Sequence, residues 1–162
     1  MVWEWLDKKY ALLYSYDYPH LTEADILGSW KKTAPYNRFD VSMIASDRRK
    51  KNNFFIGLMP TLSSWEIAAY LGYGCWNDCP CAEFHIGVQR YWHTLYDTEV
   101  VALLFDTMIM RINKSVEDKD TALNFAKDLM VYCNDVILQG YQKLRTLASA
   151  LINSTYCWFW WD

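Results

Sequence analysis

The sequence predicts a single α+β domain in which helices cover a mixed β-sheet of four to five strands. β-type runs occur in two groups separated by helical patterns, and the chain ends in a further apolar, aromatic run. At 162 residues the chain has the size of one domain and can fold without a disulfide or a metal. No internal repeat, low-complexity segment or linker divides it, so we expect residues 1–162 to form one unit.

The N-terminal part contains a short predicted helix and two β-type runs. "LTEADILGSW" is typical of a helix capped by Thr22 and ended by Gly28, and "KKTAPYN" is typical of a loop. The predicted strands cover about 39 to 45 and 53 to 59 and enclose "SDRRKKNN". The basic run Arg48–Lys51 could contact phosphate or an acidic partner, but its composition favours a solvated hairpin loop.

Two helices are expected next. "SSWE", residues 63–66, is a Ser-x-x-Glu capping box that predicts a helix to about Leu71, before the glycines at 72 and 74. A second helix from about 80 to 96 can be capped by Asn77 or Asp78, with Pro80 in its first turn. Its apolar stripe, which should lie on the sheet, consists of Phe84, Val88, Tyr91, Trp92 and Leu95.

The C-terminal part alternates between strand and helix signals. "EVVALLF" and "MIMRI" are separated by Asp106 and Thr107 and predict either a tight hairpin or, because no glycine is present, one bent strand. A long helix capped by Ser115 should run to Cys133, and a second helix should follow the break near 133–140 and end at about Asn153. "YCWFWWD" predicts a buried strand or an aromatic docking tail.

Composition and charge exclude several classes of function. A net charge of −3 and a pI of about 5.6 give no basic field that would attract nucleic acid. No apolar run is long enough to span a membrane, and "MVWEWLDKKY" lacks the apolar core of a secretory signal. We therefore expect a cytoplasmic protein, in which five irregularly spaced cysteines are reduced thiols. The 17% aromatic residues favour a packed core and a partner surface.

The stretch "GYGCWNDCPCAEFH", residues 72–85, raises the question of a metal or thiol site. Cys81 and His85 are four apart on one helix face, but a second ligand pair is missing and His93 is two turns further on. Cys79 or Cys81 at a helix N-terminus could be a thiolate with His85 as its base. The favoured interpretation is a small buried residue beside a histidine at the edge of the core. We expect no metal and no cofactor.

Asp106 and Asp135 could form a carboxylate pair for acid–base chemistry, although a turn residue and a helix cap are the simpler interpretation. The chain contains no glycine-rich phosphate loop, no Gly-x-Ser-x-Gly and no His-Glu-x-x-His. The sequence therefore leaves enzymatic activity uncertain and favours a non-enzymatic role.

Several motifs in one order resemble a bacterial family, domain of unknown function 4253: "PTLSSWEIAAYLGYGCWNDCP", "HIGVQRYWHTLYDTEVVALLFDT", "YCNDVILQG" and "WFWWD". The resemblance covers about 58–162 and makes 1–57 a variable N-terminal part. It leaves out Cys75, where glycine is usual in the family, and Cys81. The matching positions are Gly74, Trp76, Asn77, Cys79, Pro80, Tyr132, Cys133, Asp135, Gln139, Gly140, Trp158, Trp160, Trp161 and Asp162.

The first functional hypothesis is a protein-binding module. Small, acidic, aromatic-rich domains resemble immunity proteins, so we expect a cognate bacterial toxin as the partner, bound through exposed aromatic and acidic residues, by a monomer or homodimer. The alternative is a small hydrolase-like enzyme with a site around Trp76, Asp78, His85 and Asp106. A plain structural or regulatory module is the third possibility. The candidate binding or motif residues are Trp65, Trp76, Asn77, Asp78, His85, Asp106, Asp135, Gln139, Trp160 and Asp162.

Overall fold

The computed structural model describes residues 4, 6, 8, 22–39 and 55–162 of the chain. Its sheet has three strands, β1 (Thr98–Leu103), β2 (Thr107–Ile112) and β3 (Tyr156–Trp160), in the order β1-β2-β3. Both pairings are antiparallel. The described part is therefore α+β, as predicted, but its sheet is antiparallel and has three strands instead of a mixed sheet of four to five.

One of the expected strands is absent from the described residues. Residues 55–59 of the second run form no strand, and Phe55, Ile56 and Leu58 are almost fully exposed. Their apolar character was a poor guide because a strand also needs a neighbouring strand to bond its backbone. The first run, from residue 40 onward, and the basic loop Arg48–Lys51 lie outside the described residues.

β1 and β2 form the predicted hairpin, not a bent strand. Thr98 pairs with Ile112, and the amide of Leu104 donates to the carbonyl of Thr107 at 2.8 Å to close the turn. The register shifts between Val100 and Ala102, so one extra residue bulges there. The bulge and a three-residue turn explain why no glycine is needed.

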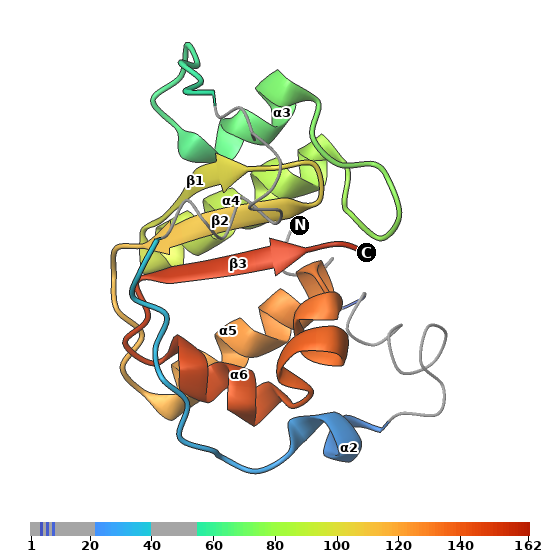
Figure 1. Ribbon diagram of the computed structural model, residues 1–162, viewed down its shortest axis with the longest axis vertical. Coiled ribbons are helices and arrows are strands. Elements are labelled where there is room, and N and C mark those ends of the chain that lie inside the picture. The colour runs from blue at the N-terminus through green and yellow to red at the C-terminus, as the bar shows by residue number, and fades with distance from the viewer. Residues whose placement is uncertain (1–3, 5, 7, 9–21, 40–54) are drawn as a thin grey trace, which may run out of the picture.

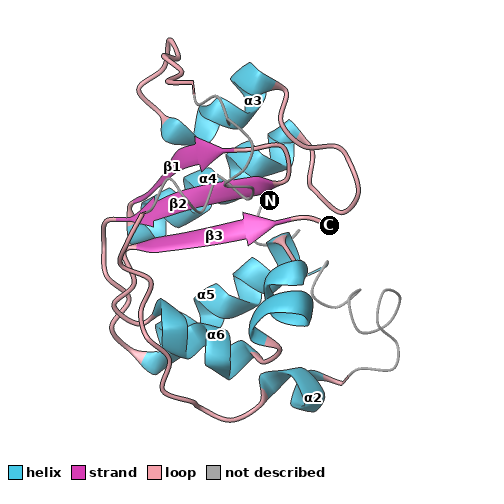
Figure 2. Ribbon diagram, viewed as in Figure 1, coloured by secondary structure: helices cyan, strands magenta, loops and turns pink. Residues whose placement is uncertain are grey.

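The helices are arranged around this sheet as Figures 1 and 2 show. α4 (Ala82–Tyr96) lies behind β1 and β2, while α5 (Lys119–Tyr132) and α6 (Leu144–Leu151) lie beside β3. Trp92 of α4 stacks on Phe159 of β3 at 5.9 Å between centroids and meets Phe125 of α5 at 5.5 Å. All three rings are fully buried, so the main core lies where α4, α5 and this face of the sheet meet.

α4 begins at a different residue and buries a different face from the prediction. It starts at Ala82 with Cys81 at the N-cap, and no side chain bonds its first amides, so neither Asn77 nor Asp78 is its cap. Phe84 is 39% exposed. The polar residues His85 and Gln89 lie on the buried face because Tyr132 gives both a buried hydrogen-bond partner. The buried positions are His85, Val88, Gln89, Trp92 and Tyr96.

The predicted helix of 63–71 divides into a 3₁₀ turn, η3 (Ser64–Glu66), and α3 (Ile67–Leu71). The capping box is wrong, because Ser63 makes no side-chain cap and the Thr61 hydroxyl bonds Glu66 Oε2 at 2.5 Å. The Thr61 hydroxyl thus competes for the carboxylate that the box required. Gly72 ends the helix in the left-handed region, with φ of 58°, as predicted.

The long helix α5 is capped by Asp118, which accepts from the amide of Thr121 at 2.8 Å, and not by Ser115. A π-helix, η4 (Val136–Tyr141), then occupies the predicted break and leads to α6. The hydroxyl of Ser115 instead contacts Asn153 Oδ1 at 3.2 Å.

The described N-terminal segment packs on these helices. α2 (Glu23–Leu27) is capped by Thr22 and ended by Gly28, as predicted. Lys127 of α5 pairs with Glu23 at 3.1 Å, and the backbone amide of Tyr36 donates to Ser154 Oγ at 2.6 Å. Within the described residues no helix is both long enough and apolar enough to cross a membrane.

Candidate binding surface

Four separate segments meet at one end of the sheet. They are the loop 72–81, the β1–β2 turn 104–106, residues 133–141 and the end of β3 with the residues after it, 160–162, which lie on the same side in Figure 1. Two hydrogen bonds donated by its backbone amides fix the last of these segments in place. The amide of Trp161 donates to the carbonyl of Asp106 at 3.0 Å, and the amide of Asp162 donates to Asp135 Oδ2 at 3.0 Å.

An aromatic pair lies on this end. Trp76, from the loop before α4, stacks on Phe105 of the hairpin turn with 5.1 Å between centroids and 13° between planes. Phe105 is 82% exposed. The sequence reasoning selected Trp76 but missed Phe105. Its position in a turn, immediately before an aspartate, is a signal that could have found it.

The four segments at this end are also acidic. Each of the four segments contains one aspartate, Asp78, Asp106, Asp135 or Asp162, and none contains Lys or Arg. The segments carry a formal charge of −4, and the chain carries −3, so all other residues together sum to +1. The excess negative charge of the protein is thus concentrated here. We call Trp76, Asp78, Phe105, Asp106, Asp135 and Asp162 the aromatic–acidic end.

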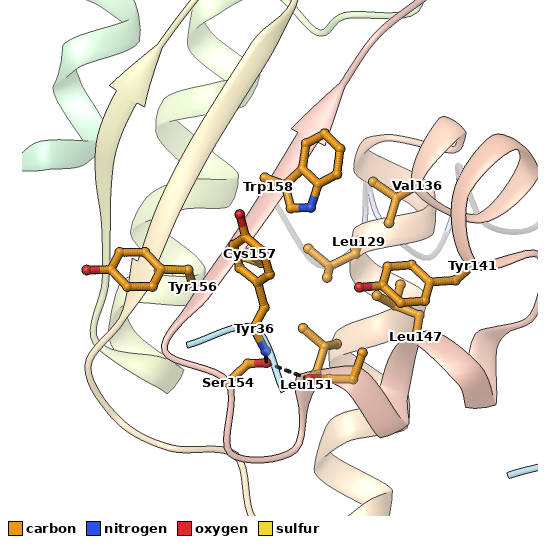
Figure 3. A pocket seen from close by; sticks show the side chains of 11 residues that line it. Tyr36, Leu129, Val136, Tyr141, Leu147, Leu151, Ser154, Tyr156, Cys157 and Trp158 are labelled. Carbon is orange, nitrogen blue, oxygen red and sulfur yellow. Dashed lines mark hydrogen bonds between the residues drawn. The ribbon is translucent and has the colours of Figure 1, made fainter. Parts of the chain in front are cut away.

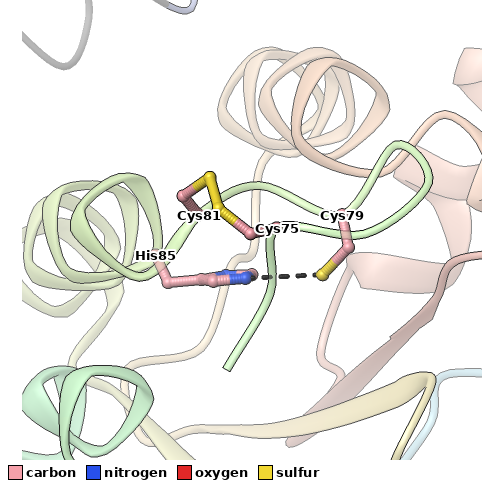
Figure 4. The surroundings of a disulfide bond; sticks show 4 residues. All are labelled: Cys75, Cys79, Cys81 and His85. Carbon is pink, nitrogen blue, oxygen red and sulfur yellow. Dashed lines mark hydrogen bonds between the residues drawn. A yellow bond between two sulfur atoms is a disulfide. The ribbon is translucent and has the colours of Figure 1, made fainter. Parts of the chain in front are cut away.

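The loop that holds Trp76 is closed by a disulfide between Cys75 and Cys81, which corrects the expectation of five reduced thiols. Figure 4 shows this bond above the buried Cys79 and His85. The sequence spacing hid the pair because Cys75 and Cys81 become neighbours only when the chain reverses at residues 76–79. These are the same two cysteines that the family resemblance left out. Cys79, Cys133 and Cys157 are free and buried.

The loop has an unusual backbone. Cys75 and Asn77 have φ of 65° and 45°, a region that L-residues other than glycine seldom adopt. The amide of Cys75 donates to the carbonyl of Pro80 at 3.1 Å. Gly74, with φ of 98°, packs so closely that a Cβ there would overlap the same carbonyl oxygen. Glycine is therefore required at position 74 by both conformation and space.

A buried polar cluster lies below the loop, centred on His85. His85 is completely buried, with Nδ1 2.5 Å from the Tyr132 hydroxyl and Nε2 3.5 Å from Cys79 Sγ. The rings of Tyr73 and Trp161 pack against the imidazole at 5.3 and 5.6 Å. Burial lowers the pKa of His85 from 6.5 to about 4, so the imidazole is neutral at pH 7.

This cluster lacks the features of a thiol catalyst. Burial raises the pKa of the Cys79 thiol to about 12, so the sulfur stays protonated at neutral pH. Cys81, the other candidate nucleophile, is bonded to Cys75. The Tyr132 hydroxyl also accepts from Gln89 Nε2 at 3.2 Å, which completes a network inside the core. Cys79 and His85 therefore act in packing and in polar pairing.

Asp106 and Asp135 have separate roles in the structure. The Asp106 side chain accepts from Thr107 in the hairpin turn, at 2.9 Å. Asp135 starts η4 and accepts from Gln139 Nε2 at 2.9 Å as well as from the Asp162 amide. The simpler interpretation, a turn residue and a helix-start residue, describes both.

The remaining candidates occupy different places. Trp65 belongs to η3 and lies against the ring of His93 at 4.5 Å, while His93 Nδ1 bonds the carbonyl of Thr98 at 2.9 Å. Trp160 stacks on Trp158 at 4.7 Å and packs against Gly140 of η4. Asn77 is exposed in the disulfide loop. The structure thus brings Gln139 and Trp160 close to the aromatic–acidic end and leaves Trp65 in another element.

A small cavity lies between β3, α5, α6 and η4 (Figure 3). Its volume is about 20 Å³, its lining is mainly apolar, and it contains none of the residues named for an enzyme site. Such a volume holds about one water molecule. The described residues include no group of three or more His, Cys, Asp or Glu side chains that could hold a metal ion.

Comparison with known proteins gives one match. A family model described as "Domain of unknown function (DUF4253)" matches residues 55–162, two-thirds of the chain and the part that contains the whole sheet and the aromatic–acidic end. Searches of curated proteins and of solved structures found no match.

Proposed function

The chain belongs to the DUF4253 family, a domain of unknown function, and from the geometry of its surface we propose that it is a protein-binding module for a basic partner. In its most specific form the proposal is an immunity protein that binds and neutralises a cognate bacterial toxin domain. The observation that carries the proposal is the exposed Phe105–Trp76 stack within a set of four aspartates and no basic residue.

The aromatic stack supports the affinity of such a contact. Phe105 is 82% exposed, and it is held in place by Trp76 below it, so it loses little conformational freedom when a partner covers it. Large, pre-positioned aromatic side chains supply much of the binding energy at protein interfaces. A partner that covers Phe105 would also remove its exposed apolar surface from water, which would add to the affinity.

The charge distribution supports the choice of partner. With −4 in the four segments and +1 in all other residues, the field at this end attracts a basic surface and repels an acidic one. Such a field raises the association rate and makes it sensitive to salt. Nucleic acid is not a suitable partner for this surface because its phosphates carry the same sign of charge.

The enzyme alternative has less support. It expects a concave pocket around Trp76, Asp78, His85 and Asp106, yet His85 is completely buried beneath packed rings. The cavity of Figure 3 is too small for a substrate and is lined by other residues.

The test is co-expression with the product of the open reading frame that neighbours this gene. We expect the neighbouring product to inhibit growth, this protein to restore it, and the purified pair to co-elute. The Phe105→Ala variant should weaken binding by about 2 kcal/mol, roughly 30-fold. A gene without a toxin neighbour, together with no rescue of growth, would refute the immunity role.

A matched charge reversal separates the surface from general charge effects. Asp106→Lys should slow association and reduce its salt dependence. Glu117→Lys, the same charge reversal at an exposed position just before the N-terminus of α5, should change neither. Equal effects of both variants would show that net charge alone matters and that the aromatic–acidic end is not the contact surface.

A further inference from the structure

Among the five cysteines, only the pair joined in the Cys75–Cys81 disulfide is accessible to solvent. Cys75 is exposed and Cys81 is half-buried, while the three free cysteines are all buried. Burial also raises the pKa of Cys79 and Cys133 to about 12. A reductant from solution can therefore reach the disulfide, whereas the three free thiols are shielded from solution.

The bond holds the loop in a conformation that the residues do not prefer. Between its two ends the backbone enters the left-handed region at Cys75 and at Asn77. Only two backbone hydrogen bonds close the loop from inside, Cys75 N–H to Pro80 O at 3.1 Å and Cys79 N–H to Trp76 O at 2.9 Å. Closing a ring of this length covalently favours the closed loop by roughly 50-fold. Without the bond, the loop should open much more often.

Opening should stay local. Cys79 is buried against His85, and the ring of His85 is enclosed by Tyr73, Tyr132 and Trp161, all of which lie outside the ring of residues 75–81 that the disulfide closes. The mobile part is therefore residues 75–78, which include Trp76 and Asp78 of the aromatic–acidic end. Its release would remove the support beneath Phe105.

We propose that Cys75–Cys81 is a reversible redox site, opened by a dithiol reductant, that determines whether Trp76 is held against Phe105. A thiolate of the reductant attacks the exposed sulfur of Cys75, the S–S bond breaks, and Cys81 leaves as a thiolate. Cys81 is the N-cap of α4, where the free amides of a 15-residue helix favour an anion. The second thiol of the reductant then attacks the mixed disulfide. The reductant ends as a disulfide, and both cysteines take up a proton, with two electrons transferred.

The first test counts thiols by alkylation with iodoacetamide and mass spectrometry. We expect no alkylated cysteine in the native oxidised protein, two after treatment with dithiothreitol without denaturant, and five after reduction in denaturant. Two labels before reduction, or none after it, would overturn the site. Five labels after reduction without denaturant would show that the bond holds the whole fold, and would overturn local control.

The second test measures loop opening by amide hydrogen exchange. On reduction, the amides of Cys75 and Cys79 should exchange at least about tenfold faster, while the amide of Cys133, bonded to Leu129 O at 2.8 Å, should not change. The Cys75→Ser/Cys81→Ser double variant should exchange at the faster rate with or without dithiothreitol. Unchanged exchange in both reduced protein and double variant would refute the inference.

An effect of the disulfide on partner binding rests on the proposed function, and the experiment distinguishes a failure of redox control from a failure of that function. If the neighbouring gene product binds, its Kd should rise at least about tenfold after reduction. Equal Kd values in the two states would refute redox control of binding. If no partner binds in either state, the proposed function fails, while the alkylation and exchange results still decide the redox site.

Discussion

Removing the titratable group of His85 tests the buried cluster directly. The imidazole is completely buried, and its two nitrogens contact Tyr132 Oη at 2.5 Å and Cys79 Sγ at 3.5 Å. A protonated imidazole would carry a charge into the apolar core, where no described acid contacts it. The chosen change is His85→Phe, because phenylalanine keeps an aromatic ring in the cage while Gln89 still bonds the Tyr132 hydroxyl.

The magnitude follows from the shift in pKa. The pKa of His85 is about 4 in the folded protein, against an ordinary value of 6.5. The folded pKa is depressed, so between pH 6.5 and 4 the unfolded chain binds the proton and the folded protein does not. Stability is therefore complete above pH 6.5 and is lost as the pH falls towards 4. The loss over this window is about 3 kcal/mol.

The assay is the free energy of unfolding in urea, measured between pH 7 and pH 4 for both proteins. The wild type should lose about 3 kcal/mol more than His85→Phe over this range, because all other groups titrate equally in the two proteins. The variant will also differ in stability at pH 7, but only the difference in slope tests the reasoning. Parallel curves for the two proteins would refute a buried neutral His85.

Three further pairs or single changes test other parts of the fold. Gly74→Ala should lower the free energy of unfolding by about 3 kcal/mol or more, because its Cβ would overlap a backbone carbonyl. Gly72→Ala, with open space around it, should lower it by only about 1 kcal/mol. Equal losses in denaturant unfolding would contradict the packing of the loop. Tyr132→Phe should lower the free energy of unfolding by about 1–3 kcal/mol, because it removes the hydroxyl shared by a buried histidine and a glutamine. Tyr73→Phe should be neutral or stabilising, since that buried hydroxyl has no partner among the described residues. The reverse order would show that the network is assigned to the wrong tyrosine. Asp118→Ala should lower the unfolding free energy by about 1 kcal/mol through loss of the α5 cap, and no loss would indicate another cap.

Local signals in the sequence were sufficient for several elements. The Thr22 cap and Gly28 end of α2 were predicted from residues within a few positions of one another. The hairpin near Asp106 and the final aromatic strand were each one of two interpretations that the same kind of local signal left open, and the structure contains both. Caps, turns and periodicity depend on backbone groups nearby in the chain, so a single sequence contains them.

Other local signals failed where a group outside the expected pattern competed, whether near or far in the sequence. The capping box at Ser63 failed because the Thr61 hydroxyl bonds Glu66. The stripe of α4 was misassigned because two polar residues, His85 and Gln89, are buried by a hydroxyl more than forty positions away. An apolar run at 55–59 found no strand to pair with in the described part of the chain. Periodicity cannot show which polar residue will find a buried partner.

The sequence by itself determined the α+β class, most helices of the C-terminal two-thirds, the family and the acidic balance of the chain. The tertiary structure alone decided that four aspartates and the Phe105–Trp76 stack share one end, and that Cys75 meets Cys81 while Cys79 is buried. The physical reason is range. Helix periods and caps are set by neighbours, but a surface is made by chain segments that hydrogen bonds and packing bring together from far apart in the sequence.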